Sequence, residues 1–142
     1  MIKKLDLTEK AVANIVGKMF RVASERLEID EEEFCRIWLK SELCQRLYEL
    51  DETLICQSKI YLFNSLVMEN DLPEKKGYKM DAEAMYWVGY ILTYWMYLRE
   101  IPGKQIEEKY DICKILQEYD TLHTVSCKVA IDMMEQDDIR EI

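Results

Sequence analysis

A run of apolar and aromatic side chains, AMYWVGYILTYWMYL, extends from Ala84 to Leu98 and is interrupted only by Gly89 and Thr93. It is shorter than the roughly 20 residues that a helix needs to cross the hydrocarbon core of a bilayer. Its tyrosine hydroxyls would also lack hydrogen-bond partners at membrane depth, which is costly. We therefore predict a helix in the core of a water-soluble protein, with no membrane span.

Residues at the start and in the middle of this run are typical of a helix at the centre of a bundle. Asp81 stands where it can cap the helix, and Glu83 suits the positive N-terminal end. Apolar side chains lie nearly all round such a helix, which is typical of a helix packed on several sides. Gly89 costs about 1 kcal/mol of helix propensity, so we expect a neighbouring helix to approach closely there.

Three tyrosines of the run leave two interpretations open. Tyr90, Tyr94 and Tyr97 either pack in the core with their hydroxyl tips at the surface, or line a ligand pocket or a binding face. The second interpretation makes these three tyrosines candidate binding residues.

The rest of the chain shows helical patterns and no alternation typical of a strand. Gly (4) and Pro (2) are scarce, so tight hairpins are hard to build repeatedly. We predict an all-α fold, a compact multi-helix bundle that forms a single domain over residues 1–142. Two long helices are expected, over residues 8–28 with Thr8 as the cap and over residues 81–99. Shorter helices are expected to start at Asp30, Ser41, Ser58, Asp111 and Ser126, and one more is expected near KQIEEKY.

The two halves of the chain, residues 1–70 and 78–142, have a similar order of segments around a polar linker at 69–79. Each half opens with a long apolar helix and continues with a short charged helix. LCQRLYELD then corresponds to ICKILQEYD, and SKIYLF to SCKVAI. This similarity predicts two pseudo-twofold helical halves that share one core. The alternative is that any two amphipathic segments align this well.

Charge and cysteine content indicate the environment and the kind of partner. The net charge of −9 repels nucleic acid and anionic lipid and attracts a basic protein, although the same charge also serves solubility. The five cysteines contain no CxxC pair, and MIKKLDLTEK lacks the apolar stretch of a secretory signal. We therefore predict a cytoplasmic protein with a protein partner and without nucleic acid.

The sequence offers few groups for catalysis or metal binding. His123 is the only histidine, and together with Cys127 and Cys113 it lacks a fourth zinc ligand, even if one helix places His123 and Cys127 on the same face. No phosphate-binding, nucleophile-elbow or metalloprotease motif occurs. We therefore predict no catalytic residue, metal or cofactor. A helix-turn-helix around GKQIEEKYDICKILQEY is disfavoured, because its second helix offers DNA only Lys114 and Gln117.

Three motifs follow one another in the C-terminal half, around a short charged helix. They are Trp87, Gly89, Tyr90, Tyr94 and Trp95 in WVGYILTYW, then Leu122, His123 and Thr124, then Ala130 and Ile131. In this order they resemble small helical proteins of gut and other Gram-positive bacteria, which share a WxGYxxxYW stretch, an [LF]HT turn and an AI helix. Such proteins are often encoded in toxin–antitoxin-like or mobile-element clusters, and the family supplies no established catalytic residues.

The resemblance implies a small, acidic, non-enzymatic interaction module of the cytoplasm, antitoxin-like, that neutralises a toxin encoded nearby. The candidate binding residues are Tyr90, Tyr94, Tyr97, His123 and Thr124. Two other hypotheses stay open. One is a small-ligand binder or enzyme with a tyrosine-lined pocket near His123, and the other is a DNA-mimicking or regulatory protein of a mobile element.

Overall fold

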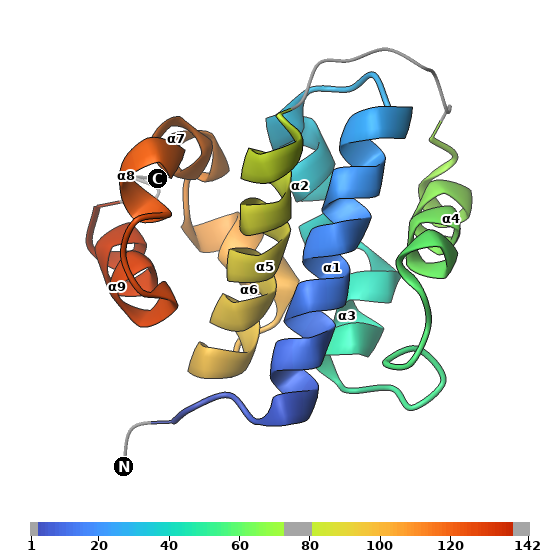
Figure 1. The fold of residues 1–142 in the computed structure, drawn as a ribbon, viewed down its shortest axis with the longest axis horizontal. Coiled ribbons are helices and arrows are strands. Elements are labelled where there is room, and N and C mark those ends of the chain that lie inside the picture. Colours follow the sequence, from blue (N-terminus) through green and yellow to red (C-terminus); the bar gives the residue numbers. More distant parts are fainter. Residues whose placement is uncertain (1–2, 73–80, 138–142) are drawn as a thin grey trace.

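The long apolar run forms α5, Ala82–Arg99, as predicted, and α5 packs along α1, Leu7–Arg26. The computed structural model describes residues 3–72 and 81–137. The two helices run antiparallel at the centre of the molecule (Figure 1). Trp95 and Met96 of α5 are fully buried, so this helix is the core element that the sequence indicates.

Seven shorter helices surround this central pair within the described residues. They are α2 (Glu31–Lys40), α3 (Glu42–Tyr48), α4 (Lys59–Asn70), α6 (Gly103–Lys109), α7 (Ile112–Gln117), α8 (Tyr119–Leu122) and α9 (Cys127–Asp137). α4 covers one flank of α1, whereas α7, α8 and α9 lie beyond α5 (Figure 1). The described part of the chain contains no strand, which confirms the all-α prediction. None of its helices is both long enough and apolar enough to cross a membrane.

Most predicted helix starts are confirmed, because a cap depends on neighbours in the sequence. The side chain at each of these predicted starts accepts a hydrogen bond from a backbone N–H of the first turn; the residues are Asp30, Ser41, Ser58, Asp81, Asp111 and Ser126. The prediction for the first helix is wrong, since Asp6 caps α1 in place of Thr8. The Asp6 carboxylate accepts from the Glu9 N–H and the Glu9 carboxylate accepts from the Asp6 N–H, so a reciprocal capping box forms this end.

Two predicted helices end earlier than expected. α1 ends at Arg26 and not at residue 28, because the backbone of Leu27 is extended. The helix expected from Asp111 is broken at Glu118 and continues as the short α8. Both differences lie within about two residues of a helix terminus or at a weak turn, where sequence patterns are least decisive.

The polar segment predicted as a linker, residues 69–79, starts too early, because Glu69 still belongs to α4. Residues 73–79 of that segment lie outside the described residues. The Glu69 carboxylate contacts α3, where it accepts hydrogen bonds from the N–H groups of Glu42 and Leu43 at 2.8 and 3.1 Å. α4 thereby satisfies two free donors at the N-terminus of α3 and holds the two helices together.

α1 and α5 approach each other closely at Gly89, as predicted. A Cβ atom added to Gly89 would lie 2.7 Å from Cγ of Phe20 and 3.0 Å from the carbonyl oxygen of Val16. Phe20 is fully buried and packs edge-on against Phe34 and Trp38, with ring centroids 4.9 and 5.9 Å away. The absent side chain of Gly89 therefore leaves the space in which Phe20 joins α1, α2 and α5 in one core.

The helices of the two halves follow each other in the predicted order. A long helix opens each half, α1 and α5, and these two are neighbours. The second helices, α2 and α6, are also neighbours, and the last helix of each half, α4 or α9, packs on its own long helix. A duplicated pair of halves would have these neighbour relations, and the duplication itself stays a prediction.

Candidate functional site

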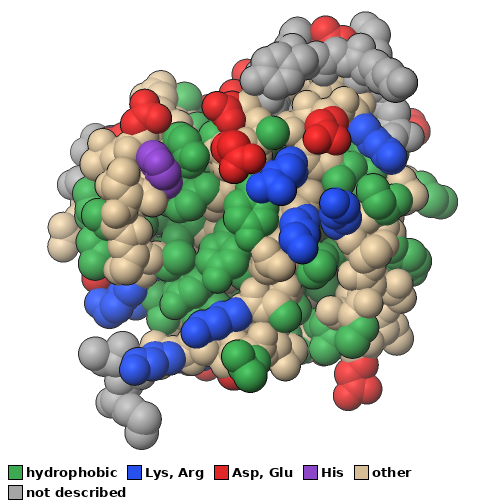
Figure 2. All heavy atoms as spheres, viewed as in Figure 1, with side chains coloured by type: hydrophobic (Ala, Val, Ile, Leu, Met, Phe, Trp, Pro, Cys, Tyr) green, Lys and Arg blue, Asp and Glu red, His purple; other side chains and the backbone are tan. Residues whose placement is uncertain are grey.

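One face of α5 is left partly open between α1 and the C-terminal helices. It carries Tyr86, Tyr90 and Tyr94, each half-buried and four residues from the next, and we call these three residues the tyrosine stripe. Neighbouring ring centroids along the stripe are 6.2 and 6.1 Å apart. Figure 2 shows a band of hydrophobic side chains on this side of the molecule, with Lys and Arg side chains along its right and lower edges.

The hydroxyl groups of the stripe differ in their partners. Tyr86 donates a hydrogen bond to Oδ1 of Asn14 in α1. The hydroxyls of Tyr90 and Tyr94 form no hydrogen bond within residues 3–72 and 81–137, so they are available to a bound molecule. Burial, and next the neighbouring Cys127, raise the pKa of both tyrosines, which keeps the hydroxyls protonated as donors at neutral pH.

A row of cations on α1 lies beside the stripe. Lys10, Asn14 and Lys18 are four residues apart and Arg21 follows three later, so all four share one face of α1. Asn14 binds the Tyr86 hydroxyl, and the Arg21 guanidinium lies 4.7 Å from the centre of the Tyr86 ring. We call the stripe and these four α1 residues the tyrosine face.

The cations of this row are weakly neutralised by the protein itself. Neither Lys10 nor Lys18 forms an ion pair within the described residues. Arg21 approaches only Glu83, at 3.6 Å in an exposed pair, and such pairs contribute little. The tyrosine face is therefore locally positive on a chain whose net charge is −9.

Tyr97, the third tyrosine predicted to bind, is not part of the tyrosine face. Its side chain is buried, its hydroxyl donates to the Leu47 carbonyl oxygen at 2.5 Å, and its ring stacks on Tyr48 at 6.3 Å. Burial raises the pKa of the Tyr97 hydroxyl. Tyr97 lines the wall of a small hollow of about 270 Å³ together with Lys3 and Glu9, where the start of α1 covers α5.

His123 and Thr124 lie at the end of α8, apart from the stripe. The His123 ring stacks on Tyr119 with centroids 4.3 Å apart, and its Nδ1 lies 2.7 Å from the Tyr119 carbonyl oxygen. The Thr124 hydroxyl donates to the Thr121 carbonyl oxygen at 2.6 Å. Both side chains are exposed and bond to their own helical turn. The structure thus brings Tyr90 and Tyr94 together and leaves the other three candidates elsewhere.

A groove between α3 and α4 was not foreseen from the sequence. It has a volume of about 660 Å³ and is lined by Leu43, Leu54, Tyr61 and Met68 among others. Met68 is 82% exposed and Tyr61 is 47% exposed. Their spacing of seven residues on a helix with apolar residues on several sides was the signal that could have revealed this groove. Neither this groove nor the hollow at Tyr97 is lined by His123.

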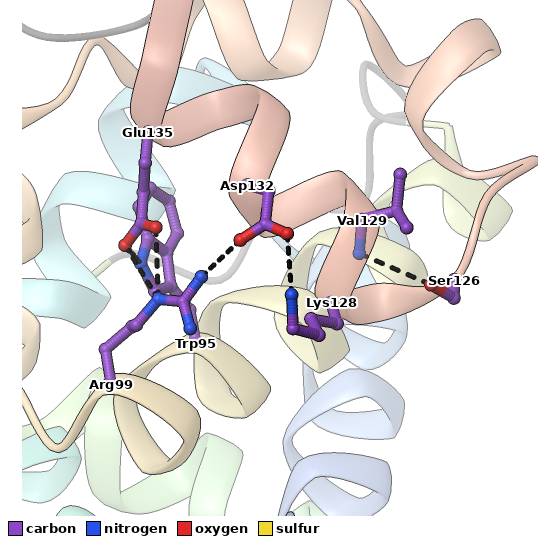
Figure 3. A network of polar contacts seen from close by, with 7 residues as sticks. All are labelled: Trp95, Arg99, Ser126, Lys128, Val129, Asp132 and Glu135. Carbon is purple, nitrogen blue, oxygen red and sulfur yellow. Dashed lines mark hydrogen bonds and ion pairs between the residues drawn. The ribbon is translucent and has the colours of Figure 1, made fainter. Parts of the chain in front are cut away.

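Polar contacts fix α9 against α5, next to the tyrosine face (Figure 3). The Trp95 indole N–H and the Arg99 Nε both donate to the Glu135 carboxylate at 3.0 Å. Arg99 also reaches Asp132 at 2.5 Å, and Lys128 reaches the same carboxylate at 2.8 Å. These contacts hold α9 in place, which brings Cys127 at its start close to the stripe.

The Asp132 contacts predict a dependence of stability on pH. The hydrogen bond from Lys128 and the neighbouring Arg99 lower the pKa of Asp132 below its ordinary value of 3.8. A lowered folded-state pKa stabilises the protein above the ordinary value, and this stabilisation is lost as the pH falls through the folded pKa. We expect Asp132→Asn to lower the urea midpoint at pH 7, and the gap to wild type to close below about pH 4.

A matched change at Asp120 serves as the control for this prediction. Asp120 is exposed and forms no ion pair among the described residues. Asp120→Asn should leave the urea midpoint nearly unchanged at pH 7. A gap between Asp132→Asn and wild type that stays constant down to about pH 2.5 would show that the ion pairs do not set the pH dependence.

The remaining reactive groups give little support to catalysis or metal binding. His123 is the C-cap that follows α8 and Cys127 begins α9, so no single helix carries both residues and they do not share a helix face. Among the described residues no three His, Cys, Asp or Glu side chains gather as a metal ion would require. Burial raises the pKa of the Cys35 and Cys44 thiols, which makes them poor nucleophiles. A scan against protein-family models finds no match to this chain, and comparisons with curated proteins and with solved structures find none either.

Proposed function

We propose that the protein is a non-enzymatic binding module of the cytoplasm that recognises another protein through its tyrosine face. The observation that carries this proposal is the pair Tyr90 and Tyr94, half-buried, held rigidly on the central helix and with unbonded hydroxyls. Tyrosine and arginine are enriched where protein interfaces are most tightly packed, because each combines a large contact area with polar groups. A ring fixed on a buried helix also loses little entropy on binding.

The chemistry of the face favours binding over catalysis. Its titratable groups are tyrosines, lysines and Arg21, and the pKa of Tyr90, Tyr94 and the nearby Cys127 is raised. A general base or a nucleophile at neutral pH needs the opposite shift. Hydrogen-bond donation and apolar contact are what these groups supply.

The partner that we propose is a toxin encoded by a neighbouring gene, because the small helical proteins that this chain resembles are often encoded in toxin–antitoxin-like clusters. The test is co-expression of the two proteins, followed by co-purification and by growth of the host. We expect a complex and rescued growth with the wild-type protein. Tyr90→Ala with Tyr94→Ala should weaken the complex at least about tenfold, since interface tyrosines often contribute more than about 1 kcal/mol each.

Tyr61→Ala is the matched control, because Tyr61 is exposed on α4 and outside the tyrosine face. It should leave the complex intact, and circular dichroism should show that every variant keeps its helices. Absence of any complex with unchanged toxicity would refute the antitoxin-like role. A complex that tolerates the α5 changes and is lost with Tyr61→Ala would move the interface to the α3–α4 groove.

A further inference from the structure

We propose that the segment of the partner that occupies the tyrosine face is an acidic amphipathic helix. This inference rests on the proposed function and names the chemical class of what is bound. The carboxylates of the bound helix face the cations of α1, and the apolar side chains of the bound helix lie on the tyrosine stripe. The net charge of the protein alone suggests the opposite, a basic partner.

The geometry of the face matches two turns of such a helix. Lys10 and Lys18 are eight residues apart on α1, and Tyr86 and Tyr94 are eight residues apart on α5. At about 1.5 Å of rise per residue, both rows extend over about 12 Å. Because α1 and α5 pack side by side, a cationic row and an apolar row of equal length run next to each other. An amphipathic helix with acids along one edge of its apolar side presents the complementary pair of rows.

Several donors on this face lack acceptors within residues 3–72 and 81–137. Lys10 and Lys18 form no ion pair in the described part of the chain, and the Nε of Arg21 is buried without a hydrogen-bond partner. The ammonium groups of the two lysines can form strong charge-assisted hydrogen bonds with bound carboxylates. The unbonded hydroxyls of Tyr90 and Tyr94 add two further donors. Donors outnumber acceptors on the face, so it suits an anionic ligand.

A short acidic peptide fits this face better than a nucleic acid. Figure 2 shows acidic side chains gathered above the hydrophobic band. Glu83 lies 3.6 Å from Arg21, and Glu25 is four residues from Arg21 on α1. A long polyanion would meet these carboxylates and the field of the net charge of −9. A two-turn helix contacts only the cationic part. Its aliphatic side chains also use the stripe, which a phosphate backbone cannot.

The test uses three fluorescein-labelled probes and the full-length protein. The first is an 18-residue helical peptide whose two central turns carry leucine at the i, i+3, i+4 and i+7 positions and glutamate along one edge of this leucine stripe, with alanine and glutamine at the other positions. The second replaces every glutamate by lysine, and the third is a 20-nucleotide thymidine oligomer. Fluorescence anisotropy at 150 mM salt should give at least tenfold tighter binding of the glutamate peptide than of either other probe. Equal or tighter binding of the lysine peptide or the oligomer overturns the inference, as does failure of the glutamate peptide to bind.

Charge reversal locates the binding on the face. Lys10→Glu with Lys18→Glu should weaken binding of the glutamate peptide at least tenfold, because two attractive charges become repulsive. The control is Lys59→Glu with Lys104→Glu, which makes the same change in net charge at exposed sites at the starts of α4 and α6. It should change the affinity less than about threefold. Equal weakening of peptide binding by both double variants overturns the inference, because the affinity would then depend only on the net charge of the protein.

The same variants separate this inference from the proposed function. With the co-expressed toxin, the Tyr90→Ala and Tyr94→Ala variant tests whether the face binds a protein at all. If that change breaks the complex and the Lys10→Glu and Lys18→Glu variant does not, the proposed function stands and the acidic partner is wrong. If both break it, both proposals are supported.

Discussion

Phe20→Ala is expected to lower the free energy of unfolding by about 3–5 kcal/mol, as removal of a buried aromatic ring does. Phe20 has no exposed surface and lies between the rings of Phe34 and Trp38 on α2 and the backbone of α5 at Gly89. The elements around it are rigid helices, so the space left by the ring cannot close. A domain of this size has a total stability of about 5–15 kcal/mol, and the loss is a large part of it.

The measurement is urea unfolding followed by circular dichroism, with the midpoint and the slope fitted separately. Tyr61→Ala is the control of similar chemistry, because Tyr61 is 47% exposed on α4; it should cost less than about 1 kcal/mol. A loss below about 1 kcal/mol for Phe20→Ala, at an unchanged slope, would mean that α1, α2 and α5 do not meet through this ring.

The fold was predictable where the signal is local or very strong. An apolar run without a polar side identifies a buried helix whatever surrounds it, and Asp81 or Ser58 caps the helix that follows it because the bond joins residues two or three apart. The error at α1 had a local signal too, since Asp6 and Glu9 in DLTE have the spacing of a capping box. The break at Glu118 has no such signal and depends on the packing of α7 and α8.

The binding face was only half predictable, because it is made by two helices from different halves of the chain. Tyr90 and Tyr94 were found from α5 alone. Tyr97 projects at nearly the same angle as Tyr90 on an ideal helix, seven residues on, and only the position of the start of α1 buries it. Lys10 and Lys18 can be assigned to the binding face only once α1 is known to pack antiparallel to α5. The net charge sums over all faces of the protein, so it gave no sign of these two lysines and suggested a basic partner.

Gly89→Ala is expected to destabilise the protein, although the same change on an exposed helix stabilises it. Alanine in a helix is favoured over glycine by about 1 kcal/mol. Against this, the new Cβ would lie 2.7 Å from Cγ of Phe20 and 3.0 Å from the Val16 carbonyl oxygen, so a ring or a backbone must move. Overpacking of this kind typically costs about 1–3 kcal/mol. The expected net result is a loss of up to about 2 kcal/mol in the free energy of unfolding, measured by urea unfolding.

A double-mutant cycle assigns this loss to the contact between α1 and α5. Phe20→Ala removes the Cγ atom that Gly89 faces and relieves that part of the collision, so Gly89→Ala should cost less in the Phe20→Ala protein than in wild type. Residues in contact typically couple by about 0.5–3 kcal/mol. Ala11→Leu, on the exposed side of α1, is the control for added volume and should show no coupling with Gly89→Ala. Stabilisation by Gly89→Ala in wild type would mean that helix propensity outweighs the contact, and that the two central helices lie further apart than the structure places them.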